Sequence, residues 1–256
     1  MTKRASMWKK IAGFLFVIGI GVVGYSGWKW LSQVTVVEVT MQGLVHAQEA
    51  EVRDLIRVDT GAVMFKLDPQ ILEDRIRRHP WIMEAHVSRL PTGSLDIRVL
   101  ERFPVAQTLG SDGRIGFYLD RNGFRMPITD AKSYPVPIIS GDIENYHPII
   151  SVSDNSLREM LYLLPSLSEE SDDIMSEIRR VGTGFEIRTT PIGSHESIPV
   201  LMGESDYESK FKLLEVFWER EILTHQEIEF ASIDLRFASQ VVTKQELRRP
   251  IKEISN

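Results

Sequence analysis

The sequence predicts an α+β protein with a single N-terminal transmembrane helix, a small domain of order β-α-α-β-β, and a larger mixed domain with a mainly antiparallel sheet. Three observations predict this arrangement: an uncharged apolar run, two helical patterns enclosed by strand patterns, and a series of short alternating runs separated by turn residues. The expected parts are a cytoplasmic tail (1–10), the transmembrane helix (11–31), the small domain (32–102), the larger domain (103–244) and a flexible tail (245–256).

The apolar run extends from Ile11 to Trp28 without a charged residue. A membrane-spanning helix needs about 20 mostly apolar residues, and Trp30 and Leu31 extend the run beyond Lys29. The residues before the run include four basic and no acidic ones: Lys3, Arg4, Lys9 and Lys10. Because positive charge stays on the cytoplasmic side, we expect the N-terminus inside and the rest of the chain exported.

A cleaved signal peptide is the alternative interpretation of the same run. The apolar region of a signal peptide is shorter, about 7–15 residues, and is followed by a small-x-small cleavage site. Here the run is longer and ends in Trp28-Lys29-Trp30, so its flanks favour a retained anchor.

The composition is that of a folded, slightly acidic protein. Of the 256 residues, 43% are hydrophobic and 26% are charged, and the net charge is −6. A mildly acidic chain has no electrostatic footprint for nucleic acid, so we expect no such partner. The chain has no cysteine, which excludes disulfides, thiolate chemistry and cysteine metal sites.

The first half of the small domain contains one strand and two helices. The β-branched run Val34–Met41 predicts a strand that ends near Gly43, and Ala47–Arg57 has a helical apolar face. A second helix begins at Asp68, an N-cap followed by proline. It ends at His79, because a residue before proline avoids helical dihedrals.

Two alternating strands complete the small domain. The turn Pro91-Thr92-Gly93-Ser94 joins them and has suitable turn residues. The first strand includes Ala85, Val87 and Arg89, and the second alternates Leu95, Ile97, Val99 and Glu101.

The larger domain is predicted to be rich in strands. Helices are expected near Ser153 and at Ser205, where Ser-Asp-Tyr-Glu predicts a capping box. Asn122-Gly123 predicts a hairpin turn, and a last strand is predicted over Ala231–Thr243. Other strands are expected at Ala106–Leu109, Ile115–Leu119, Ile174–Val181, Phe185–Thr189 and Pro199–Met202.

Motifs for catalysis are missing from the sequence. None of the six histidines has metal-binding helical spacing, and no nucleophile elbow, P-loop or dinucleotide fingerprint occurs. Asp120–Gly123 predicts a hairpin rather than a calcium loop, and the acidic run Glu169–Asp173 predicts a solvated loop. We therefore expect no catalytic residues, metal, cofactor or small-molecule substrate, although sequence alone leaves a pair of hydrolytic carboxylates open.

One stretch resembles the hallmark of FtsQ/DivIB cell-division proteins. The matching residues are Pro80, Trp81, Ile82, Ala85, Val87, Arg89, Pro91, Leu95, Ile97, Val99, Glu101, Arg102, Pro104 and Ala106. The earlier Val37–Val39 with Gly43 is similar to the first strand of the POTRA domain in that family, and Asp234–Phe237 continues the match. The resemblance extends from the anchor to about Val242.

The resemblance implies a bitopic inner-membrane protein at the division septum. Members of the family have a POTRA domain after the membrane helix and then a β domain, and they have no known enzymatic activity. They link early to late division proteins, and they bind FtsB- and FtsL-type partners through the β domain. Contacts of the POTRA domain with other divisome proteins are also implied.

The family binds FtsB chiefly by strand addition at the last strand. By the family pattern, Phe237, Ser239 and Gln240 are the implied contacts, with Arg236 beside them. Phe237 shares a face of the predicted strand with Leu235, so packing in the core is an equally good interpretation. A second implied contact is Arg179 with Arg180, whose alternative is a pair of solvated strand charges.

The PW…ERxPxA block itself is interpreted as structural. Pro80 stops a helix and Trp81 anchors a core, and Arg89, Pro91, Glu101 and Pro104 complete the motif. Two rival functions remain: a POTRA-type assembly protein for membrane or secreted proteins, and an anchored periplasmic enzyme. The length is too short for the barrel that the first rival carries, and a buried ionisable cluster would favour the second.

Overall fold

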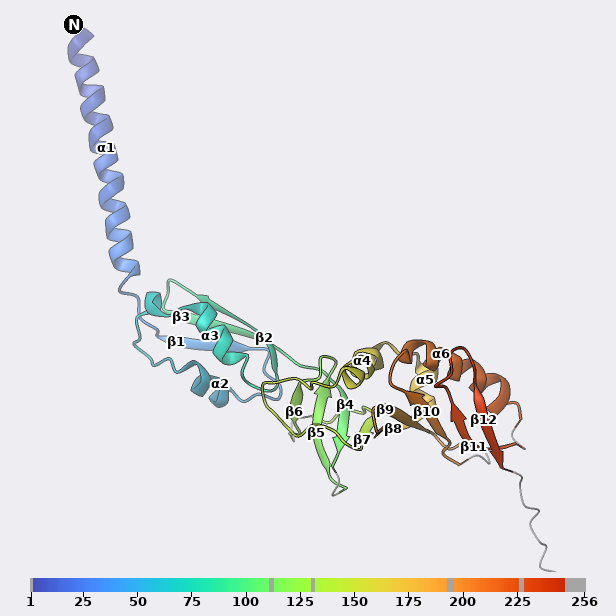
Figure 1. Cartoon of the computed structure of the whole chain (residues 1–256). Coiled ribbons are helices and arrows are strands. Elements are labelled where there is room, and N and C mark those ends of the chain that lie inside the picture. The colour runs from blue at the N-terminus through green and yellow to red at the C-terminus, as the bar shows by residue number, and fades with distance from the viewer. Residues whose placement is uncertain (1, 111–112, 130–131, 193–195, 226–227, 247–256) are drawn as a thin grey trace, which may run out of the picture. The chain divides into compact units, whose positions relative to one another are not determined.

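The computed structural model describes residues 2–110, 113–129, 132–192, 196–225 and 228–246 (Figure 1). The expected flexible tail therefore lies outside the described residues, apart from 245 and 246. The chain forms two compact units, Met1–Glu101 and Arg102–Asn256. The predicted fold class, a mixed α+β protein with an N-terminal apolar helix, is confirmed.

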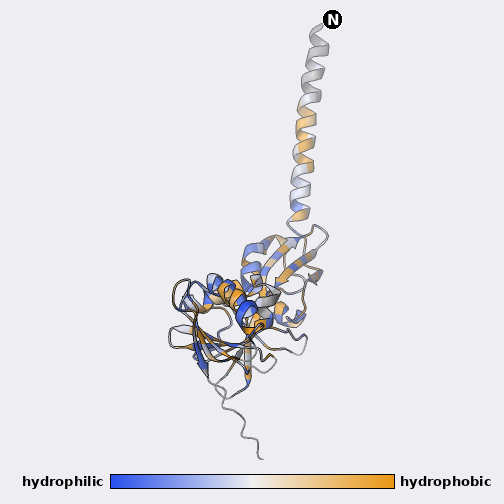
Figure 2. Ribbon diagram, turned by 90° about the vertical axis from the view of Figure 1, so that its right-hand side faces the viewer, coloured by the Kyte–Doolittle hydropathy of each residue, from blue (hydrophilic) through white to orange (hydrophobic). Residues whose placement is uncertain are grey.

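Helix α1 spans Thr2–Leu31 and includes the expected tail from Thr2 onward. Its segment Gly13–Leu31 has 19 residues, is apolar, and has no side chain buried in the protein. At ~1.5 Å per residue this segment is about 28 Å long, close to the ~30 Å hydrocarbon thickness of a bilayer. Figure 2 shows the hydrophobic band along the helix. By length and composition, α1 is able to cross a membrane.

The first unit has the predicted β-α-α-β-β order. The elements are β1 (Glu38–Gln42), α2 (Glu49–Ile56), a 3-10 turn (Met64–Lys66), α3 (Pro69–Ile76), β2 (Ile82–Arg89) and β3 (Ser94–Glu101). The sheet order is β1-β3-β2, with β1 parallel and β2 antiparallel to β3. The Asp68 carboxylate caps α3 as predicted, accepting the N–H of Gln70 at 2.9 Å. Leu95 and Ile97 of β3 lie in the same core as Val52 of α2.

Two glycines of this unit have nearly the same backbone conformation but different surroundings. Gly43 has φ +89° and Gly61 has φ +93°, a region that L-residues adopt only with strain. A Cβ at Gly43 would overlap the carbonyl oxygen of Val99, whereas a Cβ at Gly61 would meet open space. Gly43 therefore allows both the left-handed conformation of the turn after β1 and the close approach of this turn to the β3 backbone.

Replacing Gly43 with alanine should lower the free energy of unfolding by about 2–3 kcal/mol, because dihedral strain and backbone overlap add. Gly61→Ala is the matched control and should cost only the strain, about 1 kcal/mol. Denaturant unfolding of both variants measures the difference. Equal losses would show that the neighbouring β3 backbone does not constrain Gly43.

The second unit is built on a nine-stranded sheet with the order β12-β11-β10-β9-β8-β7-β4-β5-β6. Figure 1 shows helices α4, α5 and α6 along one side of this sheet. The strands are β4 (Pro104–Leu109), β5 (Ile115–Asp120), β6 (Arg125–Pro127), β7 (Ile138–Ser140), β8 (Met175–Val181), β9 (Gly184–Thr189), β10 (Pro199–Gly203), β11 (Glu229–Asp234) and β12 (Val242–Glu246). The helices are α4 (Asn155–Leu163), a 3-10 turn (Leu164–Ser166), α5 (Glu169–Ile174), α6 (Tyr207–Phe217) and a π-helical turn (Trp218–Ile222).

Most strand pairs in this sheet are antiparallel, as predicted, but β7 is parallel to both of its neighbours and β10 is parallel to β11. The core combines apolar residues of the strands with those of the helices, such as Leu157 and Met160 of α4 and Phe211 and Leu214 of α6. The apolar faces of α4 and α6 therefore pack against the sheet.

Three local predictions for this unit are wrong. The acidic run is helical, as α5, rather than a loop. Helix α6 has no capping box: its N-cap is Asp206, which adopts left-handed dihedrals and makes no side-chain cap. The predicted last strand Ala231–Thr243 is two strands joined by a turn, because residues 236–241 leave the sheet between β11 and β12.

Candidate partner-binding site

The end of the second unit is a hairpin formed by β11 and β12. Asp234 pairs with Val242 and Ile233 with Thr243 in antiparallel register. The connecting turn is closed by the N–H of Gln240, which donates to the carbonyl of Phe237 at 3.3 Å. Ser239, inside the turn, has φ +57°, a left-handed conformation that is uncommon for a residue other than glycine. Strained backbone conformations of this kind are concentrated at functional sites, so the turn is a candidate binding site.

Strand β12 forms one edge of the nine-stranded sheet. Within the described part of the chain, β11 is its single strand neighbour. One row of its backbone N–H and C=O groups therefore faces outward and is available to another strand. The opposite edge, β6, has three residues and ends in Pro127, and a proline-containing short strand is a poor template for pairing. Of the two edges, β12 is the one suited to accept a partner strand.

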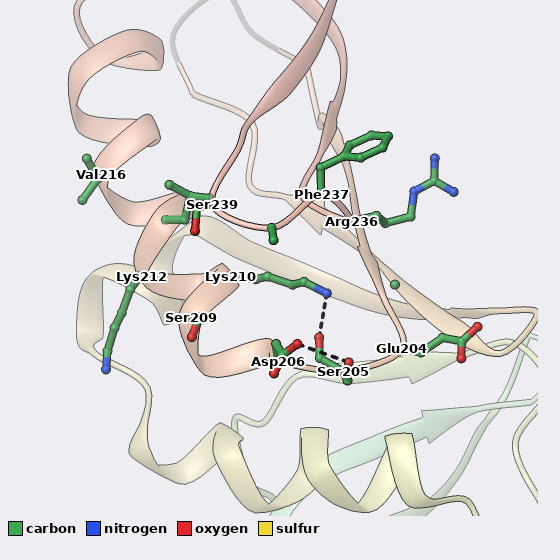
Figure 3. A pocket seen from close by; sticks show the side chains of 13 residues that line it. Glu204, Ser205, Asp206, Ser209, Lys210, Lys212, Val216, Arg236, Phe237 and Ser239 are labelled. Carbon is green, nitrogen blue, oxygen red and sulfur yellow. Dashed lines mark hydrogen bonds between the residues drawn. The ribbon is translucent and has the colours of Figure 1, made fainter.

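A groove of about 770 Å³ lies beside the hairpin (Figure 3). Leu213 and Val216 of α6 supply an apolar wall, and Phe237, Ala238 and Ser239 of the turn supply the other. Figure 3 shows Ser239 next to α6 and Lys210 reaching toward Ser205. The groove thus connects the turn to the outer face of α6, next to the edge strand.

The charges at the groove are held in defined positions. Arg236 binds Asp234 through its Nε at 2.9 Å and its Nη2 at 2.6 Å, and the Arg236 N–H also donates to this carboxylate. The hydrogen bond from Arg236 lowers the pKa of Asp234 and raises the pKa of Arg236 itself. Lys210 Nζ donates to the carbonyls of Met202 and Ser205, both at 2.6 Å. Those hydrogen-bond partners are neutral, and the positive charge of Lys210 also contributes to lowering the pKa of Asp234.

The Asp234–Arg236 pair should make folding sensitive to acid. The pKa of Asp234 is lower in the folded chain, so its contribution is present above the unfolded pKa, about 3.9, and is lost as the pH falls through the folded pKa. Asp234→Asn should lower the urea midpoint at pH 6 and have a much smaller effect at pH 3. A midpoint difference that is the same at both pH values would contradict this assignment.

The structure brings four of the predicted contacts together and separates the other two. Arg236, Phe237, Ser239 and Gln240 are exposed or partly exposed around the turn, and Phe237 is 53% exposed, so the interpretation of Phe237 as a core residue is wrong. Their role as partner contacts stays a prediction. The expectation that Phe237 lies on a strand with Leu235 is also wrong, because the strand ends at Asp234.

Arg179 and Arg180 lie on β8, four strands away from β12. Neighbouring strands are ~4.8 Å apart, so about 19 Å separates the pair from the edge. The side chain of Arg180 is 9% exposed and forms an ion pair with Asp154 at 2.6 Å, so it stabilises the domain from within. Arg179 is exposed on the sheet but is not part of the groove.

The remaining motif residues lie at positions that organise each unit. Trp81 is buried and stacks on His46 with ring centroids 3.8 Å apart. The Glu101 carboxylate accepts the N–H groups of Val45, His46 and Ala47 at 2.9–3.0 Å. This acidic side chain therefore fixes the loop between β1 and α2.

Other members of the motif act at the ends of strands. Arg89 donates to the carbonyl of Leu67 at 2.8 Å. Pro91 lies in the turn between β2 and β3, Pro80 precedes β2, and Pro104 begins β4. These proline positions are strand ends and turns, where a missing N–H does not interrupt a sheet.

Sequence reasoning missed the α6 side of the groove. Lys210 and Val216 lie outside the apolar stripe that faces the core, which runs through Phe211 and Leu214. Leu213 lies at the edge of this stripe, partly buried against the core. The sequence feature that could have indicated the groove is Val216, an apolar residue on the outer face of an otherwise amphipathic helix. Its side chain is 46% exposed. Residues 203–206 before α6 also line the groove.

Comparison with known proteins gives two consecutive family matches. Residues 34–102 match the model of the FtsQ-type POTRA domain, and residues 103–244 match the FtsQ/DivIB C-terminal related model. The chain is 38% identical to the cell division protein FtsQ of Rhodothermus marinus over 91% of this chain and 86% of that protein. It is 35% identical to the FtsQ of Salinibacter ruber over 92% of both. The chain belongs to the FtsQ/DivIB family of cell division proteins.

Proposed function

We propose that this chain is a non-enzymatic, single-pass scaffold of the bacterial divisome that binds FtsB- and FtsL-type partners by strand addition and links early to late division proteins. The observation that carries the proposal is the open edge of β12 next to the groove at α6. Membership of a cell-division family supplies the cellular context.

Strand addition explains how so short an edge gives specific binding. A partner strand alongside β12 would satisfy the outward N–H and C=O groups, and alternate partner side chains would point to the two faces of the sheet. On the helix side, one of those side chains can enter the groove between Phe237 and Val216. An apolar anchor with an acidic neighbour suits this site, because Lys210 supplies positive charge at the rim.

The proposed location is the bacterial inner membrane, with the two folded units in the periplasm. The apolar segment Gly13–Leu31 has the length of a membrane span. Basic residues precede it and no acidic residue does, which favours a cytoplasmic N-terminus. A fluorescent fusion is expected to gather at midcell, and a uniform distribution around the membrane would count against the divisome role.

Site-specific photo-crosslinking tests which edge receives the partner. A benzophenone amino acid at Lys244, on β12, is expected to give an adduct with the FtsB-type partner. The matched control is Ile128, an exposed residue directly after β6 on the opposite edge. An adduct at Ile128 but not at Lys244 would place the partner on the wrong edge and overturn the proposed binding mode.

A further inference from the structure

The end of the first unit that receives the chain from α1 has an exposed apolar and basic surface. Phe65 is 43% exposed and Leu90 is 44% exposed. Lys66 and Arg89 are exposed beside them, and Val37 is exposed as well. We call these five residues the anchor-side surface. Scattered apolar residues are common on protein surfaces, so exposure alone does not indicate a binding surface. The informative feature is the position of this group close to the end of α1.

Backbone contacts hold the parts of this surface together. The turn after β2 is closed by the N–H of Gly93, which donates to the carbonyl of Leu90 at 3.0 Å. The N–H of Val37 donates to the carbonyl of Gly93 at 2.8 Å. On the other flank, the Arg89 guanidinium lies 5.4 Å from the centroid of the Phe65 ring. Segments around positions 37, 65 and 90 therefore form one continuous surface.

The length of the connection limits how far this surface can lie from the anchor. Helix α1 ends at Leu31, and the carbonyl of Val34 accepts the N–H of Met64 at 2.9 Å. Three residues extend over at most about 11 Å. The apolar span Gly13–Leu31 matches the hydrocarbon thickness, so Leu31 lies near the hydrocarbon boundary when α1 spans a bilayer.

The headgroup layer outside that boundary is about 5–8 Å thick on each side. Val34, Met64 and the adjacent Phe65 are therefore confined to this layer or its outer margin. An apolar ring at this depth loses contact with water by entering the lipid, and basic side chains next to it reach the phosphates. The anchor-side surface has both kinds of side chain next to each other: apolar Phe65 and Leu90, and basic Lys66 and Arg89.

We propose that the anchor-side surface rests in the lipid headgroup layer, with Phe65 and Leu90 in the apolar margin and Lys66 and Arg89 at lipid phosphates. The proposal rests on the proposed membrane anchoring of α1. Asp59 and Asp68 lie near the same end, and Asp68 is engaged in capping α3. These two acidic residues offset the charges of Lys66 and Arg89, so the net charge of this end is small. The expected ligand is therefore the phosphate group of lipids in general rather than anionic lipids alone. This contact would restrict rotation of the first unit about the three-residue connection.

The absence of cysteine allows a direct test with single labels on the full chain. A cysteine replaces Leu90 or Leu100, and each carries the fluorophore NBD. Leu100 is the matched control: it is also a leucine, is 52% exposed, and lies near the opposite end of β3. The chain is placed in nanodiscs of phosphatidylcholine and phosphatidylglycerol that include a lipid with a nitroxide near the glycerol. Quenching should be several-fold stronger at position 90 than at position 100.

Two independent substitutions test the contribution of the surface. Phe65→Ser and Lys66→Glu should each reduce the quenching at position 90 several-fold. Equal quenching at positions 90 and 100, or quenching at 90 that neither substitution changes, would overturn the inference while leaving the anchor intact. Co-elution of the chain with the nanodisc monitors the anchor separately. A chain that does not enter the nanodisc would overturn both the anchoring and this inference.

Discussion

Replacing Phe237 with alanine should weaken the binding of the FtsB- and FtsL-type partners by about 30-fold or more, or ~2 kcal/mol, while the chain stays folded. The Phe237 ring is 53% exposed, so its removal leaves no cavity in the core. It lies at the junction of the turn and the groove, where an aromatic side chain can become fully buried by a partner. Aromatic residues in such positions contribute most of the binding energy of many interfaces.

The measurement is a binding titration of the full chain with the partner complex, accompanied by a thermal melt. Phe103→Ala is the matched control, since Phe103 is even more exposed but lies directly before β4, far along the sheet from β12. A charge introduced as Ser239→Glu should weaken binding in the same way, because it would be placed at the groove. Unchanged affinity in both variants would remove the turn from the interface.

The sequence was sufficient for the first unit because its signals are local. The Asp68-Pro69 start of α3, the turn around Gly93 and the alternation of β3 each depend on neighbouring residues. The strands β6 and β7 were not predicted, because three residues are too few to show an alternating pattern.

The hairpin at the candidate site was missed for a different reason. Its turn, Phe237-Ala238-Ser239-Gln240, has none of the glycine, asparagine or proline residues that signal a turn. Ser239 takes the left-handed position that glycine would normally fill. The alternation of Ile233, Leu235 and Phe237 continued through the break, so one long strand was the natural prediction.

Contacts between segments that are distant along the chain could not be predicted from the sequence. Nothing near Arg180 indicates that Asp154 lies within 2.6 Å of it. The separation of Arg179 from the turn follows from the strand order, in which β9, β10 and β11 come between β8 and β12. The four contiguous residues of the predicted site stayed together because the turn holds them, and the two distant ones did not.

The largest loss of stability is expected at a buried ion pair of the second unit. Arg102 Nη1 lies 2.7 Å from Asp120 Oδ2, and the side chains are 9% and 3% exposed. The other Asp120 oxygen accepts the N–H groups of Asn122 and Phe124 at 2.9 and 2.8 Å, closing the turn between β5 and β6. The Arg102 guanidinium also lies 3.8 Å from the centroid of the Phe124 ring. One carboxylate thus neutralises a buried cation and fixes a turn.

Asp120→Ala should lower the free energy of unfolding by about 3–5 kcal/mol, because it leaves Arg102 buried without its counter-charge. Two backbone donors of the turn lose their acceptor in the same step. The loss is a large part of the 5–15 kcal/mol that typically stabilises a folded protein. Denaturant unfolding of the full chain in detergent measures it.

Two comparisons separate the buried charge from other causes. Asp74→Ala breaks the exposed ion pair with Arg77 on α3 and should change stability by less than about 1 kcal/mol. The double replacement Arg102→Met with Asp120→Leu removes both charges and should recover part of the loss, because the desolvation cost of the unpaired cation disappears. If the double variant were as unstable as Asp120→Ala, the turn hydrogen bonds rather than the ion pair would be the dominant contribution of Asp120. Asp120 would then stabilise the domain mainly through its hydrogen bonds in the turn between β5 and β6.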